Sequence, residues 1–180
     1  MKTKIILHGG FASHVNEQND SFFREILKDA PNNLNVLLVY FAKEMDKVSA
    51  SEKDIAQFER NKQNRNIFFQ VAEEKSFVEE VRSADVIYFH GGKTLKLLEI
   101  LKKVHGLKEL LIGKVVAGES AGAYVLSSVF YSKSANGLYR GLGLVPVKLI
   151  CHYVGLNEDK LVDNPELETL LLPDYHYKVY

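Results

Sequence analysis

The amino-acid sequence predicts an α/β fold in which helices cover both faces of a mainly parallel sheet. Short apolar runs alternate along the chain with segments whose apolar residues recur at helical spacing, an order typical of parallel sheets. The apolar run at residues 35–41 has no polar alternation, as expected of a strand that is covered on both faces. A chain of 180 residues can bury a substantial core, and we expect residues 1–180 to form a single domain.

Four strands and four helices are expected in the first part of the chain, in alternating order. The strands are expected at residues 5–8, 35–41, 67–71 and 85–90, and the helices at residues 20–28, 51–64, 76–82 and 94–104. Ser51 and Asp54 resemble a capping box at the start of the second helix. Leu95, Leu98 and Leu101 would form the apolar side of the fourth helix.

The second part of the chain continues this alternation with less regular spacing. It predicts a strand at residues 114–117, a helix at 123–130, a strand at 149–153, a short helix at 165–172 and a last strand at 177–180. Residues 132–143 contain glycine and serine and lack periodicity, which predicts a surface loop that could border the substrate.

The composition indicates an ordinary globular protein and excludes several functional classes. Twenty-three basic residues balance 23 acidic ones, so no charge excess points to nucleic acid or to a membrane surface. The apolar runs are too short to span a bilayer, and the N-terminal residues lack the core of a signal peptide. A single cysteine, Cys151, excludes an internal disulfide bond. We therefore expect a cytoplasmic protein that binds neither nucleic acid nor membranes.

The most informative motif is Gly118-Glu119-Ser120-Ala121-Gly122, between an expected strand and an expected helix. A Gly-x-Ser-x-Gly turn in this setting is typical of a nucleophile elbow, which lifts the serine hydroxyl out of the sheet. The glycines let other backbone approach, and the helix N-terminus directs free N–H groups at the reacting centre. The sequence therefore predicts that Ser120 is a nucleophile. The alternative is a tight turn whose serine only caps the helix.

Two further turns are expected to lie beside this serine. Gly9-Gly10 and Gly91-Gly92 each follow a predicted strand, and ligands of parallel sheets bind at the carboxyl ends of the strands. Neither glycine pair has a dinucleotide-binding or Walker pattern, so both are interpreted as tight turns and no cofactor is expected.

A serine nucleophile needs a general base, which a carboxylate usually orients. His152 ends a predicted strand and Asp174 follows a later apolar run, which gives the order Ser, His, Asp. The rival order Ser, Asp, His of the α/β-hydrolases would use His176 with Asp163 or Asp159, and would predict an esterase. Spacing alone does not choose between these two sets.

Several segments resemble the dipeptidase E and cyanophycinase family of serine peptidases, whose fold is related to that of class I glutamine amidotransferases. The matching segments are residues 88–94 (Tyr-Phe-His-Gly-Gly-Lys-Thr), 118–123 (Gly-Glu-Ser-Ala-Gly-Ala), 141–146 (Gly-Leu-Gly-Leu-Val-Pro) before His152, and 172–174 (Leu-Pro-Asp). Their order and spacing fit the family over nearly the whole chain. The resemblance implies a flavodoxin-like three-layer sandwich and a peptidase that needs no cofactor.

The same resemblance implies a role for each site residue. Ser120 would be the nucleophile, His152 the base and Asp174 the orienting acid. The backbone N–H groups of Gly92 and Ala121 would form the oxyanion hole, because fixed donors can stabilise a developing oxyanion without reorganising.

The family's substrates are small peptides with an N-terminal aspartate and β-linked Asp-Arg polymers, so a peptide substrate is implied. An aspartate carboxylate calls for a cation near the nucleophile. The candidates in this sequence are Lys93, Arg140 and Lys160.

Three features depart from the family pattern. Lys93 stands where the family usually has asparagine, and Asp174 where it often has glutamate. The family usually continues with further strand, whereas this sequence stops at Tyr180. An open sheet edge would invite a partner strand, so we expect a monomer or a homodimer.

These departures motivate a different class of function, a non-catalytic binding module that keeps the elbow as architecture. Two other interpretations are weaker. His152, Asp174 and His176 are all metal-ligand types, but no other residues have metal-ligand spacing. Cys151 adjoins His152, but neighbouring residues of a strand point to opposite faces, which predicts a core thiol.

Overall fold

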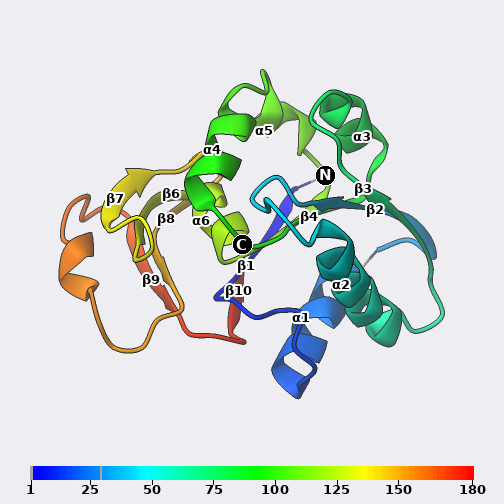
Figure 1. Ribbon diagram of the computed structural model, residues 1–180, viewed down its shortest axis with the longest axis horizontal. Helices are drawn as coiled ribbons and strands as arrows, with labels where there is room; N and C mark the ends of the chain where they lie inside the picture. The colour runs from blue at the N-terminus through cyan, green and yellow to red at the C-terminus, as the bar shows by residue number, and fades with distance from the viewer. Residues whose placement is uncertain (1, 29) are drawn as a thin grey trace.

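The computed structural model describes residues 2–28 and 30–180. Within these residues, the strands form a six-stranded sheet and a four-stranded sheet (Figure 1). The larger sheet has the order β10-β1-β5-β4-β2-β3. Its strands are β1 (Lys4–His8), β2 (Asn33–Val39), β3 (Asn66–Val71), β4 (Val86–Phe89), β5 (Val115–Glu119) and β10 (Tyr177–Val179).

The larger sheet is parallel except at one edge. β1, β5, β4, β2 and β3 are all parallel to their neighbours, whereas β10 pairs with β1 in the antiparallel direction. This arrangement confirms the predicted α/β class. Because the parallel strands share a direction, the segments that follow β1, β4 and β5 meet at one edge of the sheet.

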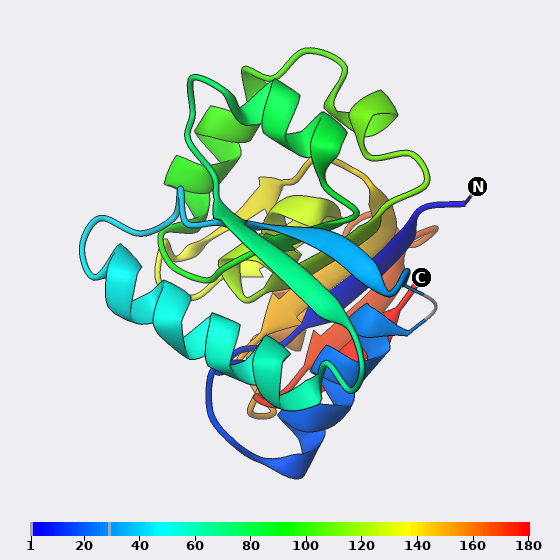
Figure 2. The ribbon, with the colours of Figure 1, turned by 90° about the vertical axis from the view of Figure 1, so that its right-hand side faces the viewer.

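Helices cover both faces of this sheet, as predicted. α1 (Glu17–Leu27) and α2 (Lys47–Asn61) pack on one face, and α3 (Phe77–Ser83), α4 (Thr94–Lys102), α5 (Leu107–Leu110) and α6 (Ala121–Leu126) on the other (Figure 2). The strands supply alternate residues to the two faces, so that Ile6 belongs to the first core and Ile5 and Leu7 to the second.

The four-stranded sheet was not predicted. It has the order β7-β6-β8-β9 and consists of β6 (Ser127–Ser132), β7 (Gly137–Arg140), β8 (Val145–Cys151) and β9 (Glu168–Leu172). Side chains of β6, β8 and β9 share a core with α6, and a 3₁₀ helix, η1 (Glu158–Leu161), lies between β8 and β9. α6 is therefore enclosed between the two sheets.

Three of the predicted elements in this region are wrong. The helix expected at residues 123–130 ends at Leu126, where the Ser127 hydroxyl turns back to donate to the Tyr124 carbonyl and the chain enters β6. The segment 165–172 is not a helix: its residues 168–172 form β9, because β8 offers a free edge to pair with. The expected loop at 132–143 contains β7, which pairs with β6.

Two details of the predicted helices are also wrong. α2 begins at Lys47, so Ser51 lies within the helix and donates to the Val48 carbonyl and does not form a capping box. In α4 the buried leucines are Leu97, Leu98 and Leu101, whereas Leu95 is exposed. The sheet lies on the Leu97 side of the helix, which the spacing of the leucines alone did not reveal.

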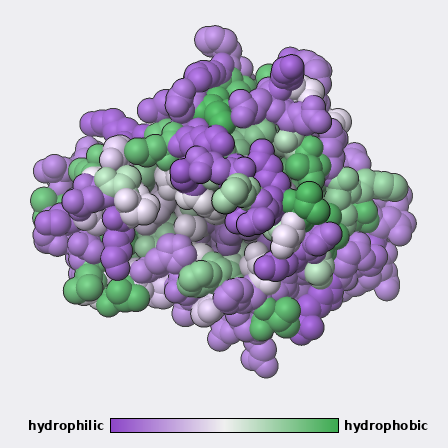
Figure 3. All heavy atoms as spheres, viewed as in Figure 1, coloured by the Kyte–Doolittle hydropathy of each residue, from purple (hydrophilic) through white to green (hydrophobic). Residues whose placement is uncertain are grey.

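Polar residues cover most of the molecular face that Figure 3 shows, with apolar residues in small separate groups. No helix in the described residues is long and apolar enough to cross a membrane. Whether the protein is a monomer or a homodimer stays a prediction.

The close packing of α6 on β4 gives a first test. A Cβ atom at Gly122 would lie 2.2 Å from the Phe89 carbonyl oxygen, which backbone geometry prevents from moving away. We expect Gly122→Ala to lower the free energy of unfolding by about 3 kcal/mol, measured by urea denaturation. Gly155→Ala is the control: its Cβ meets open space and the φ of +81° should cost only about 1 kcal/mol. Equal losses in both variants would contradict the packing argument.

Candidate active site

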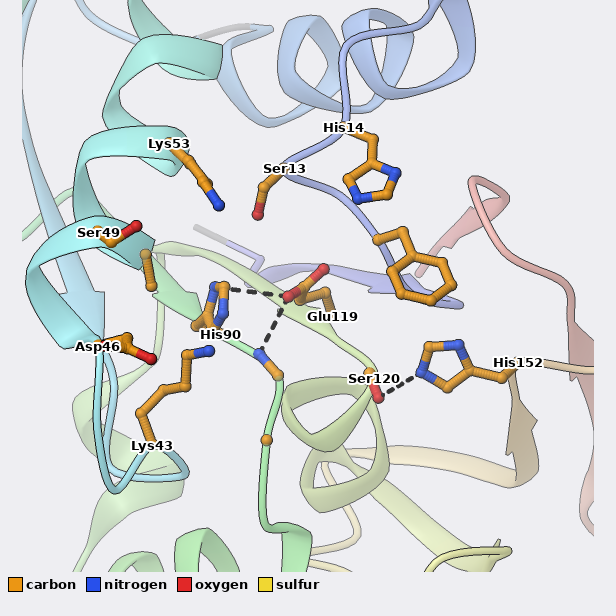
Figure 4. A pocket seen from close by; sticks show the side chains of 14 residues that line it. Ser13, His14, Lys43, Asp46, Ser49, Lys53, His90, Glu119, Ser120 and His152 are labelled. Atoms are coloured by element: carbon orange, nitrogen blue, oxygen red, sulfur yellow. Dashed lines mark hydrogen bonds and ion pairs between the residues drawn. The ribbon is translucent and has the colours of Figure 1, made fainter.

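Three side chains from distant parts of the sequence form a continuous hydrogen-bonded chain. The Ser120 Oγ atom lies 2.9 Å from Nε2 of His152 (Figure 4). Nδ1 of the same imidazole lies 2.6 Å from Oδ1 of Asp174. The structure thus brings together Ser120, His152 and Asp174, the set that the resemblance implied.

Ser120 occupies the sharp turn between β5 and α6. Its backbone has φ +48° and ψ −104°, a conformation that L residues rarely adopt, and its N–H donates to the His8 carbonyl at 2.9 Å. The turn aims the hydroxyl at His152, and the side chain makes no capping bond to α6. The alternative of a serine that only caps the helix is therefore wrong.

His152 follows β8 and is held by the loop after β1. Its backbone has φ +53°, and its N–H donates to the Gly9 carbonyl at 3.1 Å. Gly10 lies flat against the imidazole, because a Cβ atom there would be 2.1 Å from Cε1 of the ring. Phe11 packs edge-on against the same ring, with 5.3 Å between the ring centroids.

Asp174 follows β9 and is fixed by the same loop. The N–H of Tyr175 donates to the Gly10 carbonyl at 3.1 Å, and the N–H of Gly9 donates to the His176 carbonyl at 2.9 Å. Both partners of Ser120 are therefore tied by backbone bonds to the turn that ends β1.

The expected oxyanion donors lie in the turn after β4 and at the start of α6. Gly92 has φ +146°, and a Cβ atom there would be 2.6 Å from the Ala42 carbonyl oxygen. Ala121 is the first residue of α6. In the described part of the chain, the backbone N–H groups of Gly92 and Ala121 have no hydrogen-bond acceptor. Both are thus free to bind an oxygen atom of a substrate.

A cleft of about 440 Å³ opens beside Ser120. The loop after β1, the start of α2 and the turn after β4 contribute its lining, which includes Phe11, Ser13, His14, Lys43, Asp46, Ser49, Lys53, His90, Gly92 and His152. Figure 4 shows the ammonium groups of Lys43 and Lys53 pointing into this cleft. Among the described residues, neither lysine forms an ion pair.

A buried polar network lies beneath the cleft and was not predicted. The His90 Nδ1 atom lies 2.7 Å from Oδ2 of Asp54 and 3.4 Å from Oε1 of Glu119. Tyr40 donates its hydroxyl to the same Asp54 oxygen at 2.8 Å. Burial lowers the pKa of His90, but the two carboxylates outweigh it and the net direction is upward. The one signal in the sequence was that Glu119 lies inside the elbow motif.

The structure does not bring the three expected substrate cations into this cleft. Lys93 extends to Glu44, with 2.7 Å between Nζ and the carboxylate. Lys160 pairs with Asp159 on η1, and Arg140 is an exposed residue of β7. None of the three lines the cleft beside Ser120, whereas Lys43 and Lys53 do.

The rival catalytic set is not assembled. His176 is exposed and its Nδ1 lies 2.8 Å from the Asp174 carbonyl, and Asp163 is also exposed. Cys151 is buried with its thiol facing the His8 and Ser120 carbonyls, and burial raises its pKa well above the usual value. No group of side chains in residues 2–28 and 30–180 has the arrangement of a metal site.

Comparison with protein families gives one match that spans almost the whole chain. The family model described as peptidase family S51 matches residues 5–171. The chain belongs to peptidase family S51. This is the serine peptidase family of dipeptidase E and cyanophycinase, so the resemblance noted in the sequence is confirmed, and a peptide is the substrate class of the family.

Solved structures show the same fold at low sequence identity. A peptidase from an acI-B1 Actinobacterium is 22% identical, with a TM-score of 0.74 over 100% of this chain and 84% of that one. A candidate peptidase E protein from Listeria monocytogenes EGD-e is 19% identical, with a TM-score of 0.69 over 100% of this chain and 98% of that one. Comparison with curated protein sequences gave no significant match.

His8, whose carbonyl accepts the Ser120 N–H, makes stability depend on pH. Burial lowers its pKa from 6.5 to about 4, against the opposing charge of Glu119 and the hydrogen bond to Asn19. Between these two values the unfolded chain binds a proton that the folded protein does not, so stability is lost as the pH falls. We expect the titration of His8 to lower the free energy of unfolding by about 2 kcal/mol as the pH falls from about 7.5 to about 5.

Urea denaturation of the native protein and of His8→Gln at both pH values would measure this contribution. The variant should lose less stability on acidification, because glutamine does not titrate. Titration of His90, whose pKa moves in the opposite direction, is common to both proteins and cancels in the difference. An equal loss in the two proteins would show that His8 is not the group responsible.

Proposed function

We propose that this protein hydrolyses small peptides with an N-terminal aspartate, through a Ser120–His152–Asp174 triad and an acyl-enzyme. The observation that carries the proposal is the unbroken chain of hydrogen bonds from Oγ to Nε2 and from Nδ1 to the carboxylate. Membership of peptidase family S51 and the free N–H groups of Gly92 and Ala121 support it.

In the proposed reaction, His152 Nε2 takes the hydroxyl proton while the Ser120 oxygen attacks the scissile carbonyl carbon. The carbonyl oxygen becomes an oxyanion, which the N–H groups of Gly92 and Ala121 stabilise. The imidazolium then gives its proton to the leaving nitrogen, the C–N bond breaks and an ester to Ser120 remains. Water attacks this ester, with His152 again as the base, and releases the acid. Asp174 holds the imidazole in the required tautomer throughout.

The departures at Lys93 and Asp174 are compatible with this mechanism. The side chain of Lys93 extends to Glu44 and leaves the Gly92 backbone donor unaffected. The aspartate carboxylate reaches Nδ1 at 2.6 Å, so the shorter side chain still makes the contact. Neither substitution therefore favours the non-catalytic binding module.

The charges of the cleft support an acidic substrate. Lys43 and Lys53 point into it without ion-pair partners among the described residues. The carboxylate of Glu119 also lines it but is already engaged by backbone N–H groups, which leaves Asp46 as the opposing anion. A substrate carboxylate could be held between the two ammonium groups by charge-assisted hydrogen bonds.

The nucleophile is tested with a fluorophosphonate probe, whose labelled residue is identified by mass spectrometry. We expect Ser120 to be labelled in the native protein and no labelling in Ser120→Ala. His152→Ala should slow labelling at least about 1,000-fold, because the base that activates the hydroxyl is gone.

His176→Ala is the matched control, since it removes a histidine of the same loop region that does not contact Ser120. It should be labelled at close to the native rate. Labelling that depended on His176 would contradict the proposed triad, and a folded native protein that is not labelled at all would favour the binding module.

Substrate charge is tested with the dipeptides Asp-Leu and Asn-Leu, which are nearly equal in size and differ in side-chain charge. We expect the native protein to prefer Asp-Leu in kcat/KM. Lys43→Met and Lys53→Met should each reduce this preference about tenfold, the loss expected of a charge-assisted bond of about 1.4 kcal/mol. Lys160→Met, which alters a lysine outside the cleft, should leave the preference unchanged. An unaltered preference in both cleft variants would exclude these lysines as its source.

A further inference from the structure

Glu119 is a buried carboxylate directly before Ser120 in the elbow, and only 5% of its surface is exposed. Its Oε2 atom accepts the backbone N–H of Ala12 at 2.8 Å, and its Oε1 atom accepts the backbone N–H of Gly91 at 3.2 Å. These donors belong to different loops, one after β1 and the other after β4. The side chain thus connects two loops that make no strand pairing with each other.

Each of these loops contributes to the candidate active site. The loop after β1 supports the base, and the loop after β4 carries a proposed oxyanion donor. In the first, Gly10 supports the imidazole of His152, two residues before Ala12. In the second, Gly91 precedes the proposed oxyanion donor Gly92, and a Cβ atom on Gly91 would lie 3.0 Å from Oε1 of Glu119 and 3.4 Å from Cβ of Ser120. One carboxylate therefore joins the loop that supports the base to the loop that carries Gly92.

The surrounding charges retain this carboxylate in place. His90 lies 3.4 Å from Oε1 (Figure 4). It is itself bound by Asp54, which also accepts hydrogen bonds from Ser13 and Tyr40. Ser13 adjoins Ala12 in the chain, so the network closes back on the first loop. A buried carboxyl group is tolerated only where such partners satisfy its oxygen atoms.

We propose that Glu119 is a positioning residue. It holds the loop after β1, which supports His152, and the loop after β4, which carries Gly92, in fixed positions around Ser120. This inference rests on the proposed function, since it assigns Glu119 a role in that reaction. Among the described residues, Glu119 makes no hydrogen bond to a triad side chain; its oxygens accept the two backbone N–H groups, and Oε1 also lies 3.4 Å from His90.

The geometry makes Glu119→Gln a selective test. A carboxylate offers an acceptor oxygen to each loop, whereas an amide offers one carbonyl oxygen and one NH₂ group, which would face a backbone donor. The substitution therefore keeps the size of the side chain and breaks one of the two connections. Glu119→Asp keeps both oxygens but shortens the side chain, so it cannot reach both loops at once.

The control is Glu80→Gln on α3. Glu80 is also buried, and its two oxygens accept the Glu73 backbone N–H at 3.0 Å and the Ser76 hydroxyl at 2.8 Å. It does not line the cleft. Glu80→Gln makes the same chemical change at a buried carboxylate outside the cleft. Its effect on kcat therefore reports the consequence of lost stability alone.

We expect Glu119→Gln and Glu119→Asp to lower kcat on Asp-Leu about 100-fold, because small displacements of reacting groups cost that much, while KM changes less than about threefold. Glu80→Gln should lower the melting temperature by a similar amount but leave kcat unchanged. If both Glu119 variants kept native kcat in the folded state, or if KM alone rose, the proposal would be overturned.

A second readout does not depend on peptide cleavage. In NMR spectra, Glu119→Gln should shift the amide resonances of Ala12 or Gly91 and move the proton between His152 and Asp174 from its native frequency, whereas Glu80→Gln should shift neither. If the native protein cleaves no peptide, the proposed function fails, and these resonances still decide whether Glu119 links the two loops. Unchanged resonances in Glu119→Gln would overturn that link.

Discussion

The candidate site depends on a small set of backbone hydrogen bonds made by the turn after β1. The larger sheet carries Ser120, whereas His152 and Asp174 follow strands of the smaller sheet. The carbonyls of Gly9 and Gly10 accept the N–H groups of His152 and Tyr175, which fixes both partners relative to the larger sheet. The two sheets otherwise contact each other mainly through α6. Without these backbone bonds, the distances of 2.9 Å from Ser120 to His152 and 2.6 Å from His152 to Asp174 would not be maintained.

The same turn concentrates backbone strain at the site. Phe11, Ser120, His152 and Tyr175 all have positive φ between 48° and 66°, although none of them is glycine. Such conformations cost on the order of 1 kcal/mol each and persist only where the surroundings fix them. Here the fixing contacts are the backbone bonds of the loop and the flat face of Gly10 against the imidazole. The conformational free-energy cost therefore falls on residues whose side chains must point in directions that an ordinary strand end would not provide.

The sequence predicted the part of the molecule that local patterns encode. The elbow, the parallel sheet and its helices follow from periodicity and from a five-residue motif, and His152 and Asp174 came from the family resemblance. The smaller sheet was missed because short apolar runs such as residues 127–132 and 168–172 suit a helix or a strand equally until their partners are known. The cleft cations were missed for a related reason: Lys43, in the loop after β2, and Lys53, on α2, line the cleft together with residues that are far from them in the sequence.

The arrangement of charge around Ser120 separates structural anions from the cations available to a ligand. Asp54 does not line the cleft, whereas Glu119 does, and both are bound by N–H or hydroxyl donors and by His90 between them. Lys43 lies near enough to His90 to lower the pKa of that imidazole, and among the described residues its ammonium group forms no ion pair. An ammonium group without an ion-pair partner gains more from an incoming anion than one that is already paired. Under the proposed function, the network that positions the loops would therefore also leave Lys43 available to the substrate carboxylate.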